Sequence, residues 1–527
     1  MKRNTYTLVS ALLGVFIGVM ACLICVRLAG PSKKFDGDYN RWRKLNLILE
    51  QVEENYVDTI DQKAMTDAAV MAALGKLDPH SVYLPPVELK ESETELAGNF
   101  DGIGIQFNVP NDTAIVLSVI PGGPSEKAGL LQGDRIIRVD DKVIAGMKTP
   151  QDSMVRLMKG PSGSKVKIVV NRDGEQIPFD ITRGKIPVHC VDAAFMIDAE
   201  TGYIKLAKFT RTTYVEFISA VSRLRAQGMN HLIFDLRENT GGYLDQAYML
   251  CNEFLEKGDK VVYMQGLHRS RSDLDADGKG TLKDVKLSVL IDEGSASSSE
   301  IFAGAMQDND RGVIIGRRSF GKGLVQEPIN FTDGSGLRLT VARFYTPSGR
   351  CIQKPYGDDY AYDIYERYAH GELTDADSIK VNRDDVYYTV GGRAVYGGGG
   401  IIPDIFVPMD TTRASTFYIQ CSKKATTMRF ASAMFDKYRS ELIQIDDFGQ
   451  LERWLDARHL DRQFLDYAAA KDGLKPGPGE WKESEEYMMV QIKALVGRYS
   501  KVGEEAFYRF YIGIDKTLQE ALKTHAL

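Results

Sequence analysis

The feature that most constrains the fold is a strand, a tight turn of small residues and a helix that follow one another. The apolar run from Val285 to Ile291 predicts a buried strand, and the turn Gly294–Glu300 leads into an amphipathic helix that begins near Ile301. A serine in such a turn lies at the positive end of a helix, beside unpaired backbone N–H groups that suit a developing oxyanion. The segment therefore predicts an α/β unit that presents serine hydroxyls at a helix N-terminus.

A serine hydroxyl is a weak nucleophile and needs a neighbouring base. No histidine lies near the turn in sequence, but Lys322 follows it within Ser319–Gly323, and serine–lysine pairs are a variant of the serine triad. Taken one at a time, both segments are more typical of ordinary structure, since serine-rich turns cap helices and Gly-Lys-Gly forms flexible turns. Their combination points to a nucleophile and its base.

A second strand-to-helix turn has a similar pattern. His231–Arg237 predicts a buried strand, Glu238–Gly242 a turn, and Tyr243–Leu255 a helix. Glycine lets another backbone group approach closely, because it has no Cβ. By itself this motif would be read as a plain connection without chemistry.

Upstream, a succession of strands, turns and one helix resembles a PDZ domain. Gly102, Ile103, Gly104 and Ile105 open the first strand, and the helix is expected to end near Met158. The segments between them are a strand at Ile115–Ile120, a glycine-rich turn at Pro121–Gly129, a strand at Asp134–Val139 and the start of the helix near Thr149. PDZ domains bind a peptide C-terminus as an added strand, so these opening residues are expected to hold a substrate tail.

Taken together, the motifs resemble the C-terminal processing (tail-specific) serine peptidases. In that family the nucleophile motif reads close to Ser-Ala-Ser-Ala-Ser-Glu, a lysine follows at this spacing, and a glutamine comes four residues after the lysine. The resemblance assigns the nucleophile to Ser297, the base to Lys322 and the group that orients the base to Gln326.

The same resemblance supplies the oxyanion hole. Ser298 stands where the family has alanine, and its backbone N–H is expected to serve as one donor. The second donor is a glycine N–H of the other turn, and the sequence leaves open whether it belongs to Gly241 or Gly242.

The fold class implied is α/β, a crotonase-like protease core with a PDZ domain of mixed β and α structure, an N-terminal helical segment and a C-terminal helical tail. The expected divisions are an N-terminal signal anchor and flank at residues 1–33, a helical segment at 34–98, the PDZ domain at 99–184, the core at 185–410 and the helical region at 411–527.

The resemblance implies a serine endopeptidase that cleaves exported proteins near their C-termini, without metal or organic cofactor. The PDZ domain is expected to recognise the tail and to gate the active site, and a homo-oligomer or an adaptor partner is left open. One alternative is a catalytically inactive PDZ scaffold or adaptor, which the presence of Ser297, Lys322 and Gln326 disfavours. A second is a Ser-His-Asp hydrolase, which is disfavoured because the serine motif is not Gly-x-Ser-x-Gly.

Composition and the N-terminal segment indicate the class of protein and its expected location. The 527 residues are 43% hydrophobic and 26% charged, which is typical of globular domains, and the net charge of −6 gives no reason to expect nucleic acid. Thr7 to Val26 form an uncharged, mostly apolar run that is long enough to span a bilayer. We expect an uncleaved signal anchor, with a lipoprotein at Cys22 as the alternative, and the bulk of the chain outside the cytoplasm. In a Gram-negative cell that is the periplasmic side of the inner membrane.

Four further patterns give structural expectations. The spaced cysteines Cys190, Cys251, Cys351 and Cys421 predict free thiols rather than a disulfide scaffold. Asp273–Gly278 resembles the start of a calcium loop, but Asp284 stands where a bidentate glutamate is needed, so an acidic hairpin turn is expected. His80 is expected to make structural hydrogen bonds. The helical spacing of five apolar residues predicts one buried face, formed by Leu45, Ile48, Leu49, Val52 and Tyr56.

Overall fold

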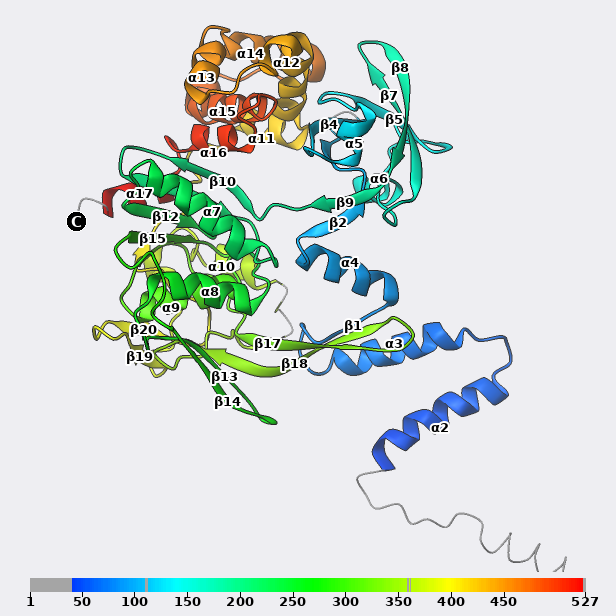
Figure 1. Ribbon diagram of the computed structural model, residues 1–527, viewed down its shortest axis with the longest axis vertical. Helices are drawn as coiled ribbons and strands as arrows, with labels where there is room; N and C mark the ends of the chain where they lie inside the picture. The colour runs from blue at the N-terminus through cyan, green and yellow to red at the C-terminus, as the bar shows by residue number, and fades with distance from the viewer. Residues whose placement is uncertain (1–39, 110–111, 358–359, 361, 525–527) are drawn as a thin grey trace, which may run out of the picture. The chain divides into compact units, whose positions relative to one another are not determined.

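The structure is a computed structural model that describes residues 40–109, 112–357, 360 and 362–524 (Figure 1). The chain divides into two units, Met1–Ala73 and Leu74–Leu527. No helix in the described residues combines the length and hydrophobicity that a membrane span requires. Thr7 to Val26 and Cys22 lie outside those residues, so the anchor and the lipoprotein alternative stay predictions.

The described part of the first unit consists of the helices α2 (Asn40–Asn55) and α3 (Gln62–Leu74). The prediction of a buried face on α2 is wrong here: Leu45 is 40% exposed, Ile48 50% and Tyr56 59%. Helical spacing fixes which residues share a face, but an apolar face becomes buried only when a second layer packs on it.

The centre of the second unit is a six-stranded sheet in the order β10-β11-β12-β15-β16-β21. All neighbouring pairs from β11 to β21 are parallel, and β10 runs antiparallel to β11. The carboxyl ends of β12 and β15 therefore meet at one edge of the sheet, where the two strand-to-helix turns of the sequence follow. The strands are β10 (Val191–Met196), β11 (Thr201–Leu206), β12 (His231–Asp235), β15 (Lys286–Ile291), β16 (Val313–Gly316) and β21 (Ile405–Phe406).

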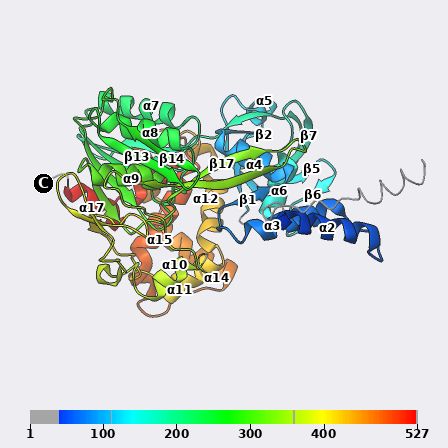
Figure 2. The same cartoon turned by 90° about the horizontal axis from the view of Figure 1, so that it is seen from below.

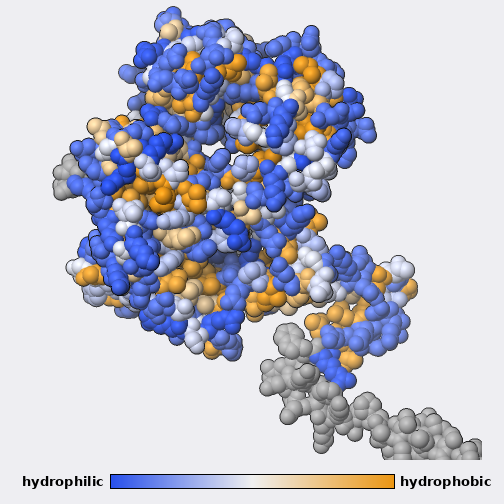
Figure 3. Space-filling model, viewed as in Figure 1, coloured by the Kyte–Doolittle hydropathy of each residue, from blue (hydrophilic) through white to orange (hydrophobic). Residues whose placement is uncertain are grey.

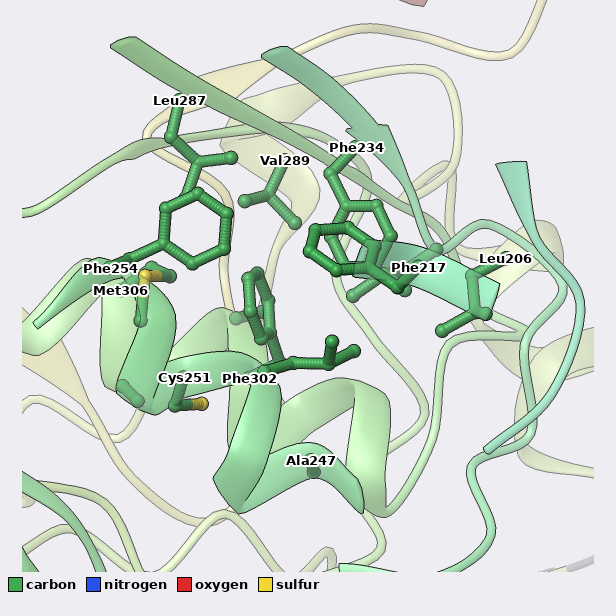
Figure 4. Packing of buried hydrophobic residues seen from close by; sticks show 14 of the residues in the cluster. Leu206, Phe217, Phe234, Ala247, Cys251, Phe254, Leu287, Val289, Phe302 and Met306 are labelled. Carbon is green, nitrogen blue, oxygen red and sulfur yellow. The ribbon is translucent and has the colours of Figure 1, made fainter. Parts of the chain in front are cut away.

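Three helices cover one face of this sheet: α7 (Thr213–Ala226), α8 (Leu244–Phe254) and α9 (Ser298–Asp308). Figures 1 and 2 both show α7 and α8 side by side. On this face of the sheet four phenylalanine rings interlock, those of Phe217, Phe234, Phe254 and Phe302 (Figure 4). The ring centroids lie 5.0 Å apart between Phe234 and Phe302 and 5.2 Å apart between Phe217 and Phe234. Cys251 is fully buried in the same cluster, as predicted for a free thiol.

A second sheet runs in the order β1-β18-β13-β14, with β17 paired to β18. Its strands are β1 (Val82–Leu84), β13 (Lys260–Gly266), β14 (Arg269–Asp275), β17 (Leu324–Asn330) and β18 (Gly336–Tyr345). The loop before β17 carries Lys322, and Gln326 lies within the strand.

The acidic segment Asp273–Gly278 is not the hairpin turn that its sequence predicted. Asp273 and Asp275 end β14, the second strand of a hairpin whose turn lies earlier, between Gly266 and Arg269. Lys260 on β13 donates to both carboxylates, at 2.5 and 2.9 Å, so they are neutralised across the strand pair. Cross-strand pairing gives these acids a structural role that their spacing alone did not reveal.

The PDZ-like part has a sheet in the order β3-β4-β5-β7-β8, with β6 (Lys142–Val143) on β5, and a separate pair of β2 with β9. Its elements are β2 (Asn99–Gly102), β3 (Ile105–Asn108), β4 (Ala114–Val119), α5 (Pro124–Ala128), β5 (Arg135–Val139), α6 (Gln151–Met158), β7 (Lys165–Arg172), β8 (Glu175–Thr182) and β9 (Gly184–Pro187). The predicted opening strand is interrupted, because Gly104 has φ +79° between β2 and β3. This left-handed conformation suits glycine and breaks the strand in two.

Helices make up most of the chain after residue 411. They are α11 (Thr416–Lys423), α12 (Thr426–Leu442), α13 (Phe448–Asp456), α14 (Leu460–Asp472), α15 (Glu480–Gly497), α16 (Glu504–Tyr511) and α17 (Lys516–Thr524). The first six share one apolar core, in which Phe435 stacks on Tyr499 with ring centroids 4.4 Å apart. The outer surface in Figure 3 is mostly hydrophilic over these helices, as expected for a globular region.

Candidate active site

The turn after β15 holds Ser297 in a strained backbone conformation. Ser297 has φ +54°, a left-handed value that costs free energy for a non-glycine residue, and it immediately precedes α9. The backbone N–H of Ser297 donates to a carboxylate oxygen of Glu300 at 2.9 Å, and the N–H of Ala296 donates to the carbonyl of Asn239 at 3.0 Å. These bonds from both sides hold the strained residue in place.

The hydroxyls of the other three serines of the motif are all engaged in hydrogen bonds. Each donates to a backbone carbonyl of the turn after β12, at 2.8 to 2.9 Å, and each residue is at most 1% exposed. The bonds run from Ser295 to Leu236, from Ser298 to Gly242 and from Ser299 to Asn239. Ser297 is partly exposed and lines a cavity, so its hydroxyl stands apart from the three that join the two turns.

Glu300 joins the serine turn to the lysine loop. Its carboxylate is fully buried and accepts four hydrogen bonds: from the N–H of Ser297 at 2.9 Å, the hydroxyl of Ser319 at 2.5 Å, and the N–H groups of Gly321 at 2.7 Å and Lys322 at 2.8 Å. Burial raises the pKa of Glu300, and the four donors oppose that shift. One side chain therefore fixes the backbone on both sides of the site.

Lys322 and Gln326 are brought together by the start of β17. The Lys322 ammonium donates to the amide oxygen of Gln326 at 3.1 Å, and the Gln326 amide nitrogen donates to the carbonyl of His80. The segment is extended at Gln326, which lies within β17. Burial lowers the pKa of Lys322, the positive charge of Arg338 lowers it further, and Glu300 opposes the shift.

His80 acts through hydrogen bonds, as predicted. Asp78 accepts from the N–H of His80 at 2.8 Å and from Ser81 and Thr340, which fixes the loop that presents the His80 carbonyl to Gln326. Burial and the nearby Lys322 lower the pKa of His80 to about 4, so its ring is neutral at neutral pH. Its Nε2 lies 2.7 Å from the hydroxyl of Tyr360.

The glycines of the second turn lie against the serine turn. A Cβ on Gly241 would lie 2.7 Å from the carbonyl oxygen of Ala296, and one on Gly242 would lie 2.0 Å from that of Phe209. Both positions therefore require glycine. The N–H of Gly241 already donates to the side chain of Asn239 at 2.9 Å, whereas within the described residues no protein acceptor is assigned to the N–H of Gly242 or Ser298.

A cavity of about 840 Å³ brings these groups together. It is lined by all six residues that the sequence assigns to the catalytic and oxyanion roles: Ser297, Lys322, Gln326, Gly241, Gly242 and Ser298. Apolar side chains of α4 (Pro86–Leu96) and of the second sheet complete the wall, including Leu89, Leu324, Leu337 and Phe344.

The four predicted tail-binding residues of the PDZ-like part are not among the cavity's lining residues. The carbonyl of Ile103 accepts from Ser125 and that of Gly104 from Ile120, at 2.9 and 3.0 Å, which fixes the loop between β2 and β3. A Cβ on Gly104 would lie 2.9 Å from the Ile186 side chain.

Two features of the site received no role from the sequence. One is Glu300. It ends the serine motif, and a glutamate three residues into a helix is a capping signal that could have marked it. The other is the pair Asp235 and Arg237, which directly precedes the second turn. Burial alone would raise the pKa of Asp235, but the Arg237 guanidinium and the Lys205 ammonium hold it well below its usual value.

Comparisons with known proteins identify the family and the domains of this chain. The family model described as peptidase family S41 matches residues 200–362, and the model described as PDZ domain matches residues 102–182. A Bartonella bacilliformis protein named carboxy-terminal-processing protease is 36% identical over 347 residues, which are 64% of this chain and 78% of that protein. The carboxy-terminal processing protease CtpA of Bacillus subtilis is 33% identical over 328 residues, 62% of this chain and 70% of that protein.

Among solved structures, the photosystem II D1 C-terminal processing protease aligns with 27% identity and a TM-score of 0.38, over 70% of this chain and 87% of that one. The matches of both family models confirm the predicted fold class of an α/β protease core with a PDZ domain, and the structure shows the helical C-terminal region.

The four-donor role of Glu300 gives a test. Glu300→Gln keeps the side-chain volume but removes the charge and replaces one accepting oxygen by an amide N–H₂ group, which then faces two of the four donors. We expect kcat on a short peptide to fall at least about tenfold, because each hydrogen bond to a charged group contributes about 1.5–3 kcal/mol.

The matched control is Glu327→Gln, since Glu327 is an exposed carboxylate on β17 that pairs with Arg269. Steady-state hydrolysis and thermal unfolding are measured for both variants. A folded Glu300→Gln protein with wild-type kcat would contradict the structural role given to this carboxylate.

Proposed function

Because the chain belongs to peptidase family S41, as a serine protease of the carboxy-terminal-processing type, we propose that Ser297 is its nucleophile and Lys322 its general base. The observation that carries the proposal is the division among the four serines. Three hydroxyls are buried and donate to backbone carbonyls, including that of Ser298, which also lines the cavity. Ser297 is partly exposed in this cavity, which Lys322 lines as well. Ser297 is thus the serine of the motif that faces both a substrate-sized space and a candidate base.

In this mechanism the neutral amine of Lys322 accepts the proton of the Ser297 hydroxyl as the oxygen attacks the scissile carbonyl. The lysine later returns the proton to the leaving amine. Burial and Arg338 favour the neutral amine by lowering its pKa. Gln326 orients the amine at 3.1 Å without adding a negative charge that would favour the protonated form.

We assign the oxyanion hole to the N–H groups of Gly242 and Ser298. Gly241 is disfavoured as the donor, because its N–H is already bonded to the Asn239 side chain. The serine that replaces the family's alanine supports the arrangement, since the Ser298 hydroxyl donates to the Gly242 carbonyl at 2.9 Å and links the two donor residues. Preorganised donors of this kind stabilise the negative charge of the tetrahedral intermediate.

The alternatives have less support. An inactive PDZ scaffold would have no need for a desolvated lysine held by an oriented amide. A Ser-His-Asp mechanism would need a histidine base at the serine. His80, which contacts the proposed orienting residue, bonds to Gln326 through its backbone carbonyl and to Tyr360 through its ring.

The substrates we propose are exported proteins with exposed C-terminal tails, cleaved near those tails. The PDZ domain would bind the tail through Gly102, Ile103, Gly104 and Ile105 and would gate the active site. The chemistry supports gating because a neutral lysine depends on its buried setting, so a small displacement of Lys322 or Gln326 disables the base. A tail that binds the active arrangement better shifts the population toward it.

Ser297→Ala and Lys322→Ala should each lower kcat/KM by several orders of magnitude, as loss of a nucleophile or base does in serine proteases. Lys380→Ala, an exposed lysine outside the cavity, is the control and should retain activity. In the wild type, kcat/KM should rise with pH as Lys322 loses its proton, with a midpoint below the 10.5 of an ordinary lysine. Near-wild-type proteolysis by Lys322→Ala would refute the base assignment.

Gating is tested with peptides too short to need the PDZ groove. Gly104→Ala strains a left-handed glycine and pushes on Ile186, and we expect the rate on such peptides to change about fivefold or more. Gly174→Ala is the matched control, because Gly174 has φ +93° with open space around it. An effect confined to the apparent affinity for long substrates would make the PDZ domain a passive tether.

We also propose that Thr7 to Val26 remain attached as a membrane anchor, with the catalytic part outside the cytoplasm. The support is the length of the uncharged apolar run. Mass spectrometry of the mature N-terminus should find this segment intact. A chain that begins at a lipid-modified Cys22, or after Arg27, would refute the anchor and leave export standing.

A further inference from the structure

The last helix, α17, packs on the six-stranded sheet. Its Leu518 and Ala521 join a buried cluster with Ile233, Leu290 and Ile315. These are strand residues next in sequence to Phe234, Val289 and Ile314, which face α8 and α9 on the other side. Since neighbouring strand residues point to opposite faces, α17 covers the second face of the sheet.

One carboxylate at the start of α17 has two partners. An oxygen of Asp515 accepts from the N–H groups of Thr517 at 3.0 Å and Leu518 at 3.1 Å, which caps the helix. Its other oxygen lies 2.7 Å from a terminal nitrogen of Arg237. Both charged side chains are about four-fifths buried, so the pair is only weakly screened by solvent.

Arg237 lies between the sheet and the turn that carries the proposed oxyanion donor. Its guanidinium also contacts the fully buried Asp235, at 2.6 to 3.1 Å, and its carbonyl accepts from Lys205. The next residues in the chain are Glu238–Gly242. The backbone that leads into the turn is therefore anchored through Arg237, and Arg237 is held by one carboxylate from the sheet and one from α17.

The ion pairs around Arg237 join two cations to two carboxylates. Lys205 and Arg237 face Asp235 and Asp515, with the hydroxyl of Tyr203 donating to Asp235 at 2.7 Å. Removing the negative charge of Asp515 takes away one of the two carboxylates that contact Arg237 directly and leaves Arg237 and Lys205 both paired with Asp235, in a largely buried setting. Such an imbalance favours displacement of Arg237, because an unpaired buried charge is costly.

We propose that Asp515 is a positioning residue for the oxyanion hole: it holds Arg237, which fixes the turn that presents Gly242 beside Ser298. The inference rests on the proposed role of those two N–H groups. It makes α17, which lies beyond the residues that the peptidase model matches, a component of the active site's support.

The two partners of Asp515 can be separated by substitution in the full-length protein. Asp515→Asn keeps an oxygen that can cap α17 and removes the charge that faces Arg237, whereas Asp515→Ala removes both. Asp515→Glu keeps the charge. Glu520→Gln is the matched control on the same helix, because Glu520 pairs with the exposed Lys523 and is remote from Arg237 in the ion-pair network.

The measurement is kcat and KM on a short peptide, with rates expressed per active site counted by a serine-directed probe, so that unfolded protein does not contribute. We expect Asp515→Asn and Asp515→Ala both to lower kcat about tenfold with KM nearly unchanged. That loss is smaller than the hundredfold or more caused by deleting an oxyanion donor. Asp515→Glu should recover part of kcat, and Glu520→Gln should match the wild type.

Wild-type kcat in Asp515→Asn, with a loss in Asp515→Ala, would show that Asp515 only caps the helix and would overturn the proposal. Unchanged kcat in both would do the same. The proposed function fails separately, if Ser297→Ala retains activity. An inactive Ser297→Ala beside a fully active Asp515→Asn would leave the proposed function intact and refute the positioning role alone.

Discussion

The geometry of the site depends on a buried carboxylate that accepts hydrogen bonds from two loops. Glu300 accepts hydrogen bonds from the N–H groups of Ser297 and Lys322, which lie in the loops that follow β15 and β16. Because both N–H groups bond to this one side chain, Glu300 fixes the positions of the two proposed catalytic residues relative to each other. A buried carboxylate without four donors would be costly, so the donors and the acceptor stabilise one another.

The parallel sheet provides the second constraint. Because β12 and β15 are parallel neighbours, the turns that follow them meet, and three serine hydroxyls join one turn to the other. The four serines of the motif therefore differ in role: three join the two turns, and one remains for chemistry. Structural hydroxyls preserve the close approach of Gly241 and Gly242, and the remaining serine sits in a strained conformation that only a fixed surrounding can maintain.

Much of this could be predicted from the sequence, because local patterns specify it. The run Val285–Ile291, the turn at Gly241 and Gly242, and the spacing from Lys322 to Gln326 each encode a local geometry, and the structure confirms those elements. Contacts between distant segments were beyond such reasoning. The carbonyl of His80 on Gln326, the pairing of Asp515 with Arg237 and the cross-strand neutralisation of Asp273 all depend on tertiary packing. The prediction of a buried face on α2 was wrong for the same reason, since periodicity does not reveal whether a second layer packs on that face.

We propose Ser297 as the reactive serine and Lys322 as the base that activates it. The most direct test is covalent labelling of the full-length protein by a fluorophosphonate, with the modified residue identified by peptide mass spectrometry over a series of pH values. We expect modification at Ser297, at a rate that rises with pH as Lys322 loses its proton. In Lys322→Ala the rate of modification should fall strongly. Modification at Ser295, Ser298 or Ser299, or a rate that is indifferent to Lys322, would contradict it.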